Sequence, residues 1–192
     1  MDFKGHLETA WHATLANIAP LIIITLVMTI ISVCTIGILA PVMMAGFTQA
    51  VLLMLRENRS PGVGDLFSEM RLFLPLFAFG LAVFIVTIIG FMLLVLPGLL
   101  VMLGVTFACM YMLPLMTDRR LGLIDAIKES WAMATRGDIV DHVAVVVIFL
   151  GINMVGSSVG IGILFTQPFA TVFLMSVYQE KIGAGLPPQP PA

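Results

Sequence analysis

The sequence predicts an all-α integral membrane protein: six transmembrane helices arranged as three hairpins, each preceded by a cytoplasmic amphipathic helix. Apolar residues make up 60% of the 192 residues and only 10% are charged, whereas soluble domains carry about 25% charged residues. Mean hydropathy is +1.11. Three long stretches contain no Asp, Glu, Lys or Arg, namely Thr9–Leu55, Leu72–Thr117 and Val143–Gln179.

Each uncharged stretch is long enough for two membrane crossings. A helix rises about 1.5 Å per residue and the hydrocarbon core is about 30 Å thick, so one crossing needs roughly 20 residues. The stretches therefore predict hairpins over residues 18–55, 72–117 and 139–178 of a single membrane domain, 1–180. Residues 181–192 are rich in Gly and Pro, which predicts a flexible tail.

The first hairpin is divided by the sequence "GILAP" at Gly37–Pro41, with Pro41 well placed as a first helical residue. Its helices are expected over residues 21–39 and 41–55. An amphipathic segment over residues 3–16 precedes it, because Phe3, Leu7, Trp11 and Leu15 recur at helical spacing along one face.

The second hairpin is divided at Leu96–Gly98. Pro97 removes a helix donor and Gly98 adopts turn dihedrals at low cost. One helix through the whole stretch would overshoot the bilayer by more than about 30 Å, so a turn is predicted instead of a kink. Pro114 is expected to kink the returning helix. An amphipathic segment over residues 63–71 precedes this hairpin.

The third hairpin is divided by "GSSVG" at Gly156–Gly160, and Pro168 is expected to kink its second helix. The amphipathic segment before it spans residues 122–136 and places Leu123, Ile127, Trp131 and Ala134 on one face.

A motif in the charged loops predicts an internal repeat. Arg59-x2-Gly62-x2-Asp65-x3-Glu69 recurs sixty residues later, and the second copy reads Arg119-x2-Gly122-x2-Asp125-x3-Glu129. We expect three copies of an amphipathic helix plus a hairpin, all in the same orientation.

The basic residues predict sidedness. All nine Lys and Arg lie at the termini or in the two long loops, and none lies in the three short turns. The positive-inside rule therefore places both termini and both long loops in the cytoplasm.

Candidate functional residues are few. Gln49, Asn153 and Gln167 are the intramembrane polar side chains that are most costly to leave unpaired, and they either line a polar path or bond between helices. Trp11 and Trp131 are candidate anchors at the membrane interface or in a protein contact.

The sequence predicts no catalytic residue, no cofactor and no metal site. Glu8 and His12 are spaced for a shared metal but lack further ligands. Asp138, Asp141 and His142 lie together at the start of a predicted span. The helix dipole stabilises acidic residues at such a position without any functional role. The net charge of −2 gives no electrostatic case for nucleic-acid binding.

Three segments resemble an uncharacterised family of bacterial multi-pass membrane proteins, domain of unknown function 975, which is related to the membrane portion of some glycerophosphodiester phosphodiesterases. They are "LPG" at Leu96–Gly98, "DAIKES" at Asp125–Ser130 followed by "ATRG" at Ala134–Gly137, and "QPFATVFLMSVYQE" at Gln167–Glu180. The resemblance implies a bacterial inner-membrane protein. We do not expect phosphodiesterase activity from this resemblance, because we expect no soluble enzyme domain attached to this membrane domain.

These observations predict a non-enzymatic scaffold or accessory subunit whose partners are membrane lipids and other membrane subunits or further copies of itself. An alternative is a transporter or channel for a small neutral or lipid-like molecule, lined by Gln49, Asn153 and Gln167. A third is an enzyme that acts on lipid headgroups through Asp138, Asp141 and His142.

Overall fold

The structure is a computed structural model that describes residues 2–135, 139–158 and 162–185, and within these ranges it is helical without a β-strand. Two short 3-10 helices, η1 and η2, separate the first three α-helices from the rest. In chain order the elements are α1 (Phe3–Ala16), α2 (Ile18–Cys34), α3 (Ala40–Glu57), η1 (Val63–Phe67), η2 (Met70–Leu72), α4 (Phe73–Leu93), α5 (Val95–Cys109), α6 (Met112–Asp118), α7 (Leu123–Thr135), α8 (Ile139–Ser158) and α9 (Ile163–Gly185).

Three helical segments are long and apolar enough to cross a membrane. They are Val63–Leu93, which ends in α4, Val95–Asp118, which joins α5 and α6, and Ile139–Ser158, which is α8. Helices α1 and α2 are bent by 86° and form a fourth candidate if the pair is taken as one span. The predicted class, a helical membrane protein, is confirmed at this level of three or four candidate spans.

Helices α3 and α9 form the interior of the protein. Ten residues of α3 are buried, among them Met43, Phe47 and Val51. Helix α9 packs against α1, α2, α3 and α8, and it buries Phe173 and Tyr178 completely. Gln49 lies in α3 and Gln167 lies in α9. The predicted spans that contain these two polar side chains are therefore the ones that pack against other helices of the chain.

The first turn covers residues 35–39, two residues before the predicted division at Gly37–Pro41. Helix α2 ends at Cys34, and Ile36 and Gly37 adopt left-handed backbone conformations with φ of 54° and 79°. Pro41 lies in the first turn of α3, where its missing N–H group leaves no helical hydrogen bond unmade.

The second turn was predicted two residues too late. The chain reverses at Leu94, whose backbone is extended, and Pro97 lies in the first turn of α5 instead of in the turn itself. The reason is that proline is well accommodated in a first helical turn. Gly98 is then available for packing: a Cβ added to Gly90 of α4 would lie 2.9 Å from the Cα of Gly98.

The two prolines predicted to kink helices behave differently. Helix α5 ends at Cys109 and α6 begins at Met112. This break lies about one helical turn before Pro114, because Pro114 has no N–H group to donate to the carbonyl of residue 110. Pro168 lies within α9, and the helix continues through it.

Two of the three amphipathic segments are α-helices, α1 and α7, and the third is not. Residues 63–71 form the 3-10 helices η1 and η2 instead of the expected α-helix. Gly62 and Gly64 at the start of this segment weaken α-helix formation, because glycine loses the most backbone entropy on folding. Arg136 and Asp138 lie outside the described residues, as does part of the third predicted turn.

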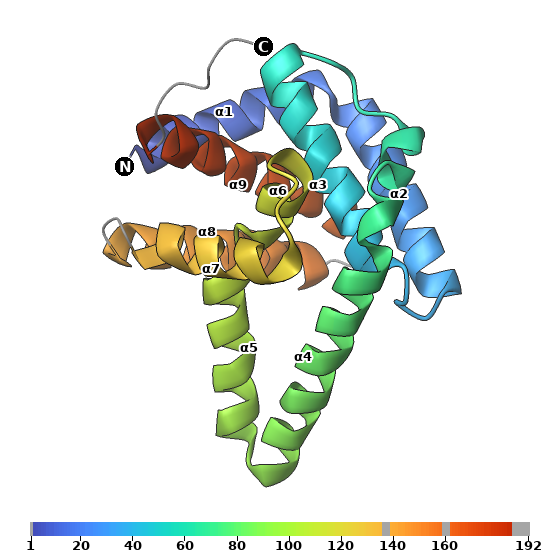
Figure 1. The fold of residues 1–192 in the computed structure, drawn as a ribbon. Coiled ribbons are helices and arrows are strands. Elements are labelled where there is room, and N and C mark those ends of the chain that lie inside the picture. The colour runs from blue at the N-terminus through green and yellow to red at the C-terminus, as the bar shows by residue number, and fades with distance from the viewer. Residues whose placement is uncertain (1, 136–138, 159–161, 186–192) are drawn as a thin grey trace.

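Helices α4 and α5 project from the body of the protein as a V (Figure 1). They meet at the Leu94 turn and diverge toward the other helices. Helices α8 and α9 pack along each other, and α8 runs across the body end of α5 rather than alongside it (Figure 1). The two helix pairs therefore do not point in one common direction in this arrangement.

In both copies of the repeated loop motif the aspartate lies near the glycine, although the first copy begins a 3-10 helix and the second an α-helix. The backbone N–H of Gly62 donates to Asp65 Oδ2 at 2.8 Å. A Cβ added to Gly62 would lie 3.7 Å from Asp65 Oδ2, and one added to Gly122 would lie 3.8 Å from Asp125 Oδ2. In both copies the aspartate lies three residues after a glycine and turns back toward it at the start of a helical segment.

Candidate functional site

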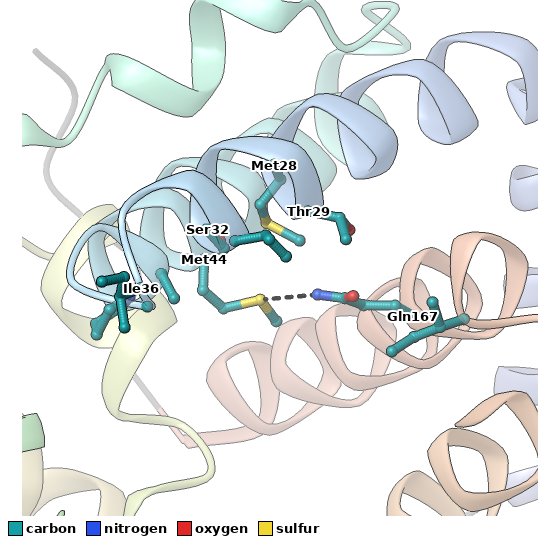
Figure 2. A pocket seen from close by; sticks show the side chains of 11 residues that line it. Met28, Thr29, Ser32, Ile36, Met44 and Gln167 are labelled. Atoms are coloured by element: carbon teal, nitrogen blue, oxygen red, sulfur yellow. Dashed lines mark hydrogen bonds between the residues drawn. The ribbon is translucent and has the colours of Figure 1, made fainter. Parts of the chain in front are cut away.

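A cavity of about 670 Å³ lies between α2, α3 and α9 (Figure 2). Its walls are mainly aliphatic and methionine side chains, and Thr29, Ser32 and Gln167 supply its polar side-chain atoms. Gln167 Nε2 donates to the Met44 sulfur at 3.6 Å. A thioether is a weak acceptor, so the Gln167 amide retains the capacity to donate to a better acceptor.

Gln49 and Asn153 do not share this cavity with Gln167. Asn153 Nδ2 donates to the Phe149 carbonyl at 2.8 Å, a bond within α8. The amide oxygen of Gln49 is buried and has no hydrogen-bond partner among the residues that the structure describes. Asn153 therefore bonds within its own helix, and of the three candidate polar residues only Gln167 lines this cavity.

A second cavity of about 210 Å³ lies between α3, α5, α6, α8 and α9. Met44 lines both cavities, so they adjoin at its side chain. Thr48 and Thr171 face the second cavity, although neither was among the candidate residues. Thr171 Oγ1 donates to the Gln167 carbonyl at 2.9 Å. The sequence did contain a signal for them, because Gln167 and Thr171, like Met44 and Thr48, are four residues apart and share a helix face.

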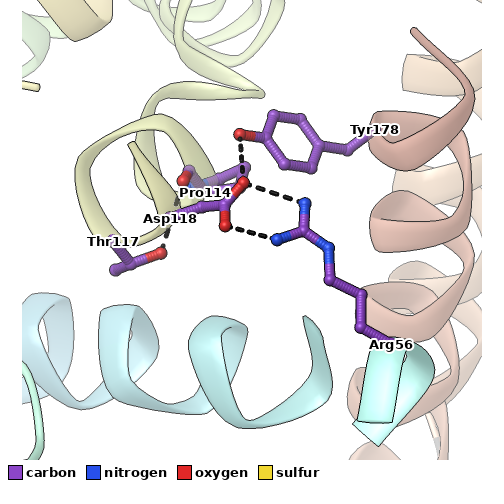
Figure 3. Close-up of polar contacts among 5 residues, drawn as sticks. All are labelled: Arg56, Pro114, Thr117, Asp118 and Tyr178. Atoms are coloured by element: carbon purple, nitrogen blue, oxygen red, sulfur yellow. Dashed lines mark hydrogen bonds and ion pairs between the residues drawn. The ribbon is translucent and has the colours of Figure 1, made fainter. Parts of the chain in front are cut away.

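A charged cluster joins the ends of α3, α6 and α9 (Figure 3). Arg56 binds Asp118 with two parallel hydrogen bonds of 2.5 and 2.9 Å, and the Tyr178 hydroxyl donates to Asp118 Oδ2 at 3.3 Å. The hydrogen bond to Asp118 raises the pKa of Arg56 above its ordinary value, with partial burial acting against it. No sequence spacing predicted this contact, because its three residues come from distant segments.

Further polar contacts hold α9 against its neighbours. His6 of α1 contacts Glu180 and Ser176 of α9. Lys181 Nζ donates to the Met133 carbonyl at 3.1 Å and lies 5.3 Å from the centroid of the Tyr111 ring. Burial lowers the pKa of Lys181. These contacts make α9 the helix through which α1, α3, α6 and α7 are connected.

The residues considered for metal or headgroup chemistry are not gathered into a site in the described structure. No group of three or more His, Cys, Asp or Glu side chains in the described ranges lies close enough to hold a metal ion. His142 is fully buried, with Nε2 3.0 Å from the Phe107 carbonyl, and Glu8 pairs with Lys4 at 3.7 Å. Asp138 lies outside the described residues, so that hypothesis stays a prediction.

Trp11 and Trp131 are both half-exposed, at 48% and 52%. Trp11 packs edge-on against Phe165 and Phe169 of α9, with ring centroids 6.2 Å apart in each case. Trp131 packs against Phe107 at 5.9 Å. Each indole is thus partly covered by aromatic neighbours and partly exposed, which is compatible with an anchoring role.

Comparisons of the chain with protein-family models, with curated proteins and with solved structures found no match.

Proposed function

We propose that this protein is a non-enzymatic scaffold or accessory subunit of a larger assembly in the bacterial inner membrane. The observation that carries the proposal is the V formed by α4 and α5. Phe84, Ile85 and Val86 are 61%, 49% and 51% exposed. Successive helical residues are rotated by about 100°, so these three cover most of the circumference of α4. The chain's own helices cover α4 mainly on the side that faces α5, where Gly90 is buried, and leave most of the rest of its circumference exposed.

The second arm of the V is equally uncovered. On α5, Leu100 and Met102 are 61% and 50% exposed, and near the turn Met92 reaches 82%. A helix that is apolar all round lies either in lipid or within a larger protein core. Because the two arms diverge from the Leu94 turn, the surfaces between them favour occupation by helices of another subunit.

A photo-cross-linking experiment tests for that subunit. Benzoylphenylalanine at Val86 of α4 is expected to form protein adducts in native membranes, whereas the same residue at Val147 of α8 is not. Val147 is a matched control because it is also an exposed valine, at 61%, but lies outside the V and lines neither of the two cavities described above. Adducts would be detected by mass-shifted bands and identified by mass spectrometry. Equal lipid-only labelling at both positions, together with a monomeric mass in mild detergent, would contradict the proposal.

We propose a topology of six spans in three hairpins with both termini in the cytoplasm. The distribution of the nine basic residues supports this sidedness. The steep crossing of α8 over α5 is the feature that makes a direct test necessary (Figure 1). The membership of the domain of unknown function 975 family, and the three-fold repeat, belong to the same proposal.

Cysteine accessibility tests the topology. In a Cys34→Ser, Cys109→Ser background, we expect Ser60→Cys to react with a membrane-impermeant maleimide only in inverted vesicles. Met92→Cys and Ser157→Cys are expected to react only from the outer face, because the turns that contain them carry no basic residue. The readout is labelling in intact cells compared with inverted vesicles. Reaction of Ser157→Cys from the cytoplasmic side would show that α8 and α9 do not form the third hairpin.

A further inference from the structure

We propose that the two cavities along α9 form one binding groove for a single acyl chain of a membrane phospholipid. The cavities lie end to end, because Met44 lines both of them. On α9 the lining begins with Ile163 and Gln167 in the larger cavity and continues with Thr171 and Met175 in the smaller one. These residues follow each other at intervals of four along one face of the helix.

The dimensions fit one chain. Ile163 and Met175 are separated by about 18 Å along the axis of α9, at the usual rise per residue. One leaflet contributes about half of the 30 Å hydrocarbon core, so the groove is about as long as a chain that crosses one leaflet. The larger cavity, at about 670 Å³, lies within the range of roughly 300–1,000 Å³ that is usual for small-molecule sites.

The lining selects for a neutral, apolar ligand with an acceptor at one end. The side chains that line the two cavities include no Asp, Glu, Lys, Arg or His. The larger cavity holds the Gln167 amide, whose nitrogen contacts a weak sulfur acceptor, and the Ser32 side chain faces the same space (Figure 2). An ester carbonyl is a neutral acceptor that suits both donors. A free fatty acid would bring a carboxylate to a lining without a cation, which is unfavourable.

The orientation of the chain follows from the two ends of the groove. The larger cavity adjoins the turn between α2 and α3, where Ile36, Gly37 and Ala40 contribute to its wall. The smaller cavity lies on the side of Met44 away from that turn and is lined by Phe149, Leu174 and Met175. The ester would therefore lie near the turn and the methyl end of the chain near Met175.

Photolabelling with a lipid probe tests the groove. The protein is reconstituted in vesicles of phosphatidylethanolamine and phosphatidylglycerol that contain a trace of phosphatidylcholine with a diazirine at the methyl end of one acyl chain. We expect adducts on peptides that contain Leu174 and Met175, mapped by mass spectrometry. Label confined to the outward faces of α4 and α5 would overturn the proposal, because the probe would then report only surrounding lipid or a groove filled by protein.

A matched pair of variants adds a second test. Met44→Trp places an indole where the two cavities meet and is expected to lower labelling of the Leu174–Met175 peptide about tenfold, which corresponds to about 1.4 kcal/mol. Met102→Trp makes the same change on an exposed face of α5 and is expected to leave that labelling unchanged. Undiminished labelling in Met44→Trp would overturn the proposal, and the wild-type map decides it if that variant does not fold. A monomeric protein would refute the scaffold function without changing either result.

Discussion

Replacement of Gly46 by alanine is expected to destabilise the protein by about 2 kcal/mol, although alanine is the better helix former. Gly46 lies in the middle of α3, where η1 crosses the helix at close range. A Cβ at this position would lie 2.6 Å from the Asp65 carbonyl oxygen and 2.7 Å from the Leu66 carbonyl carbon. Both are backbone atoms, so the overlap cannot be relieved by a side-chain rotation.

The crossing segment is also held in place by its own hydrogen bonds. The Asp65 carbonyl accepts from the Ser68 N–H at 3.2 Å and from the Ser68 hydroxyl at 2.7 Å. Moving η1 away from α3 would strain these bonds and the burial of Leu66, which is fully enclosed. The overlap is therefore expected to disrupt the packing between α3 and η1 and so to lower the free energy of unfolding.

Gly104→Ala is the matched control for Gly46→Ala. Gly104 lies in α5, and no atom from outside the adjacent backbone of its own helix lies within 4 Å of the position that its Cβ would take. The same methyl group is expected to be neutral or to stabilise the protein there, by up to about 1 kcal/mol from helix propensity. Thermal or denaturant unfolding in mild detergent, followed by tryptophan fluorescence, measures both variants. If Gly46→Ala unfolded at the same point as Gly104→Ala, the close crossing of α3 and η1 would be wrong.

Gly46 also shows how far the sequence could be interpreted. The spacing Gly46-x3-Ala50 indicated a close helix contact but not whether the contact lies within one chain or between two. The structure shows an internal contact, and its partner is a 3-10 segment that the sequence presented as an amphipathic helix. Small residues mark where backbones approach each other, and they do not identify the approaching backbone.

The helices themselves were predictable because they depend on local signals. The uncharged lengths, the turn at Gly37 and the helical stripe of α7 are all properties of neighbouring residues. The turn at Leu94 was misplaced because Pro97 fits a first helical turn as well as it fits a loop. The cavities on α9 needed the relative placement of α2, α3 and α9, which is set by packing between distant segments.

The Arg56–Asp118 pair gives the second large expected effect. Arg56→Ala is expected to destabilise the protein by about 2 kcal/mol, below the range for a fully buried pair because Arg56 is 39% exposed. The cost arises mainly at Asp118, whose side chain is only 14% exposed and would lose both guanidinium hydrogen bonds. Arg56→Lys is expected to recover part of the loss, because a lysine supplies the charge without the bidentate geometry.

A double-mutant cycle separates the pair from the general effect of losing an arginine. Asp118→Asn removes the carboxylate, so Arg56→Ala is expected to cost less in the Asp118→Asn background than in the wild type. The Lys4–Glu8 pair is the control: its side chains are 87% and 61% exposed, and its removal is expected to leave unfolding unchanged. Additive losses for Arg56→Ala and Asp118→Asn would mean that the two residues do not interact in the folded protein. The link between α3, α6 and α9 would then depend on apolar packing and on the Tyr178 hydroxyl alone (Figure 3).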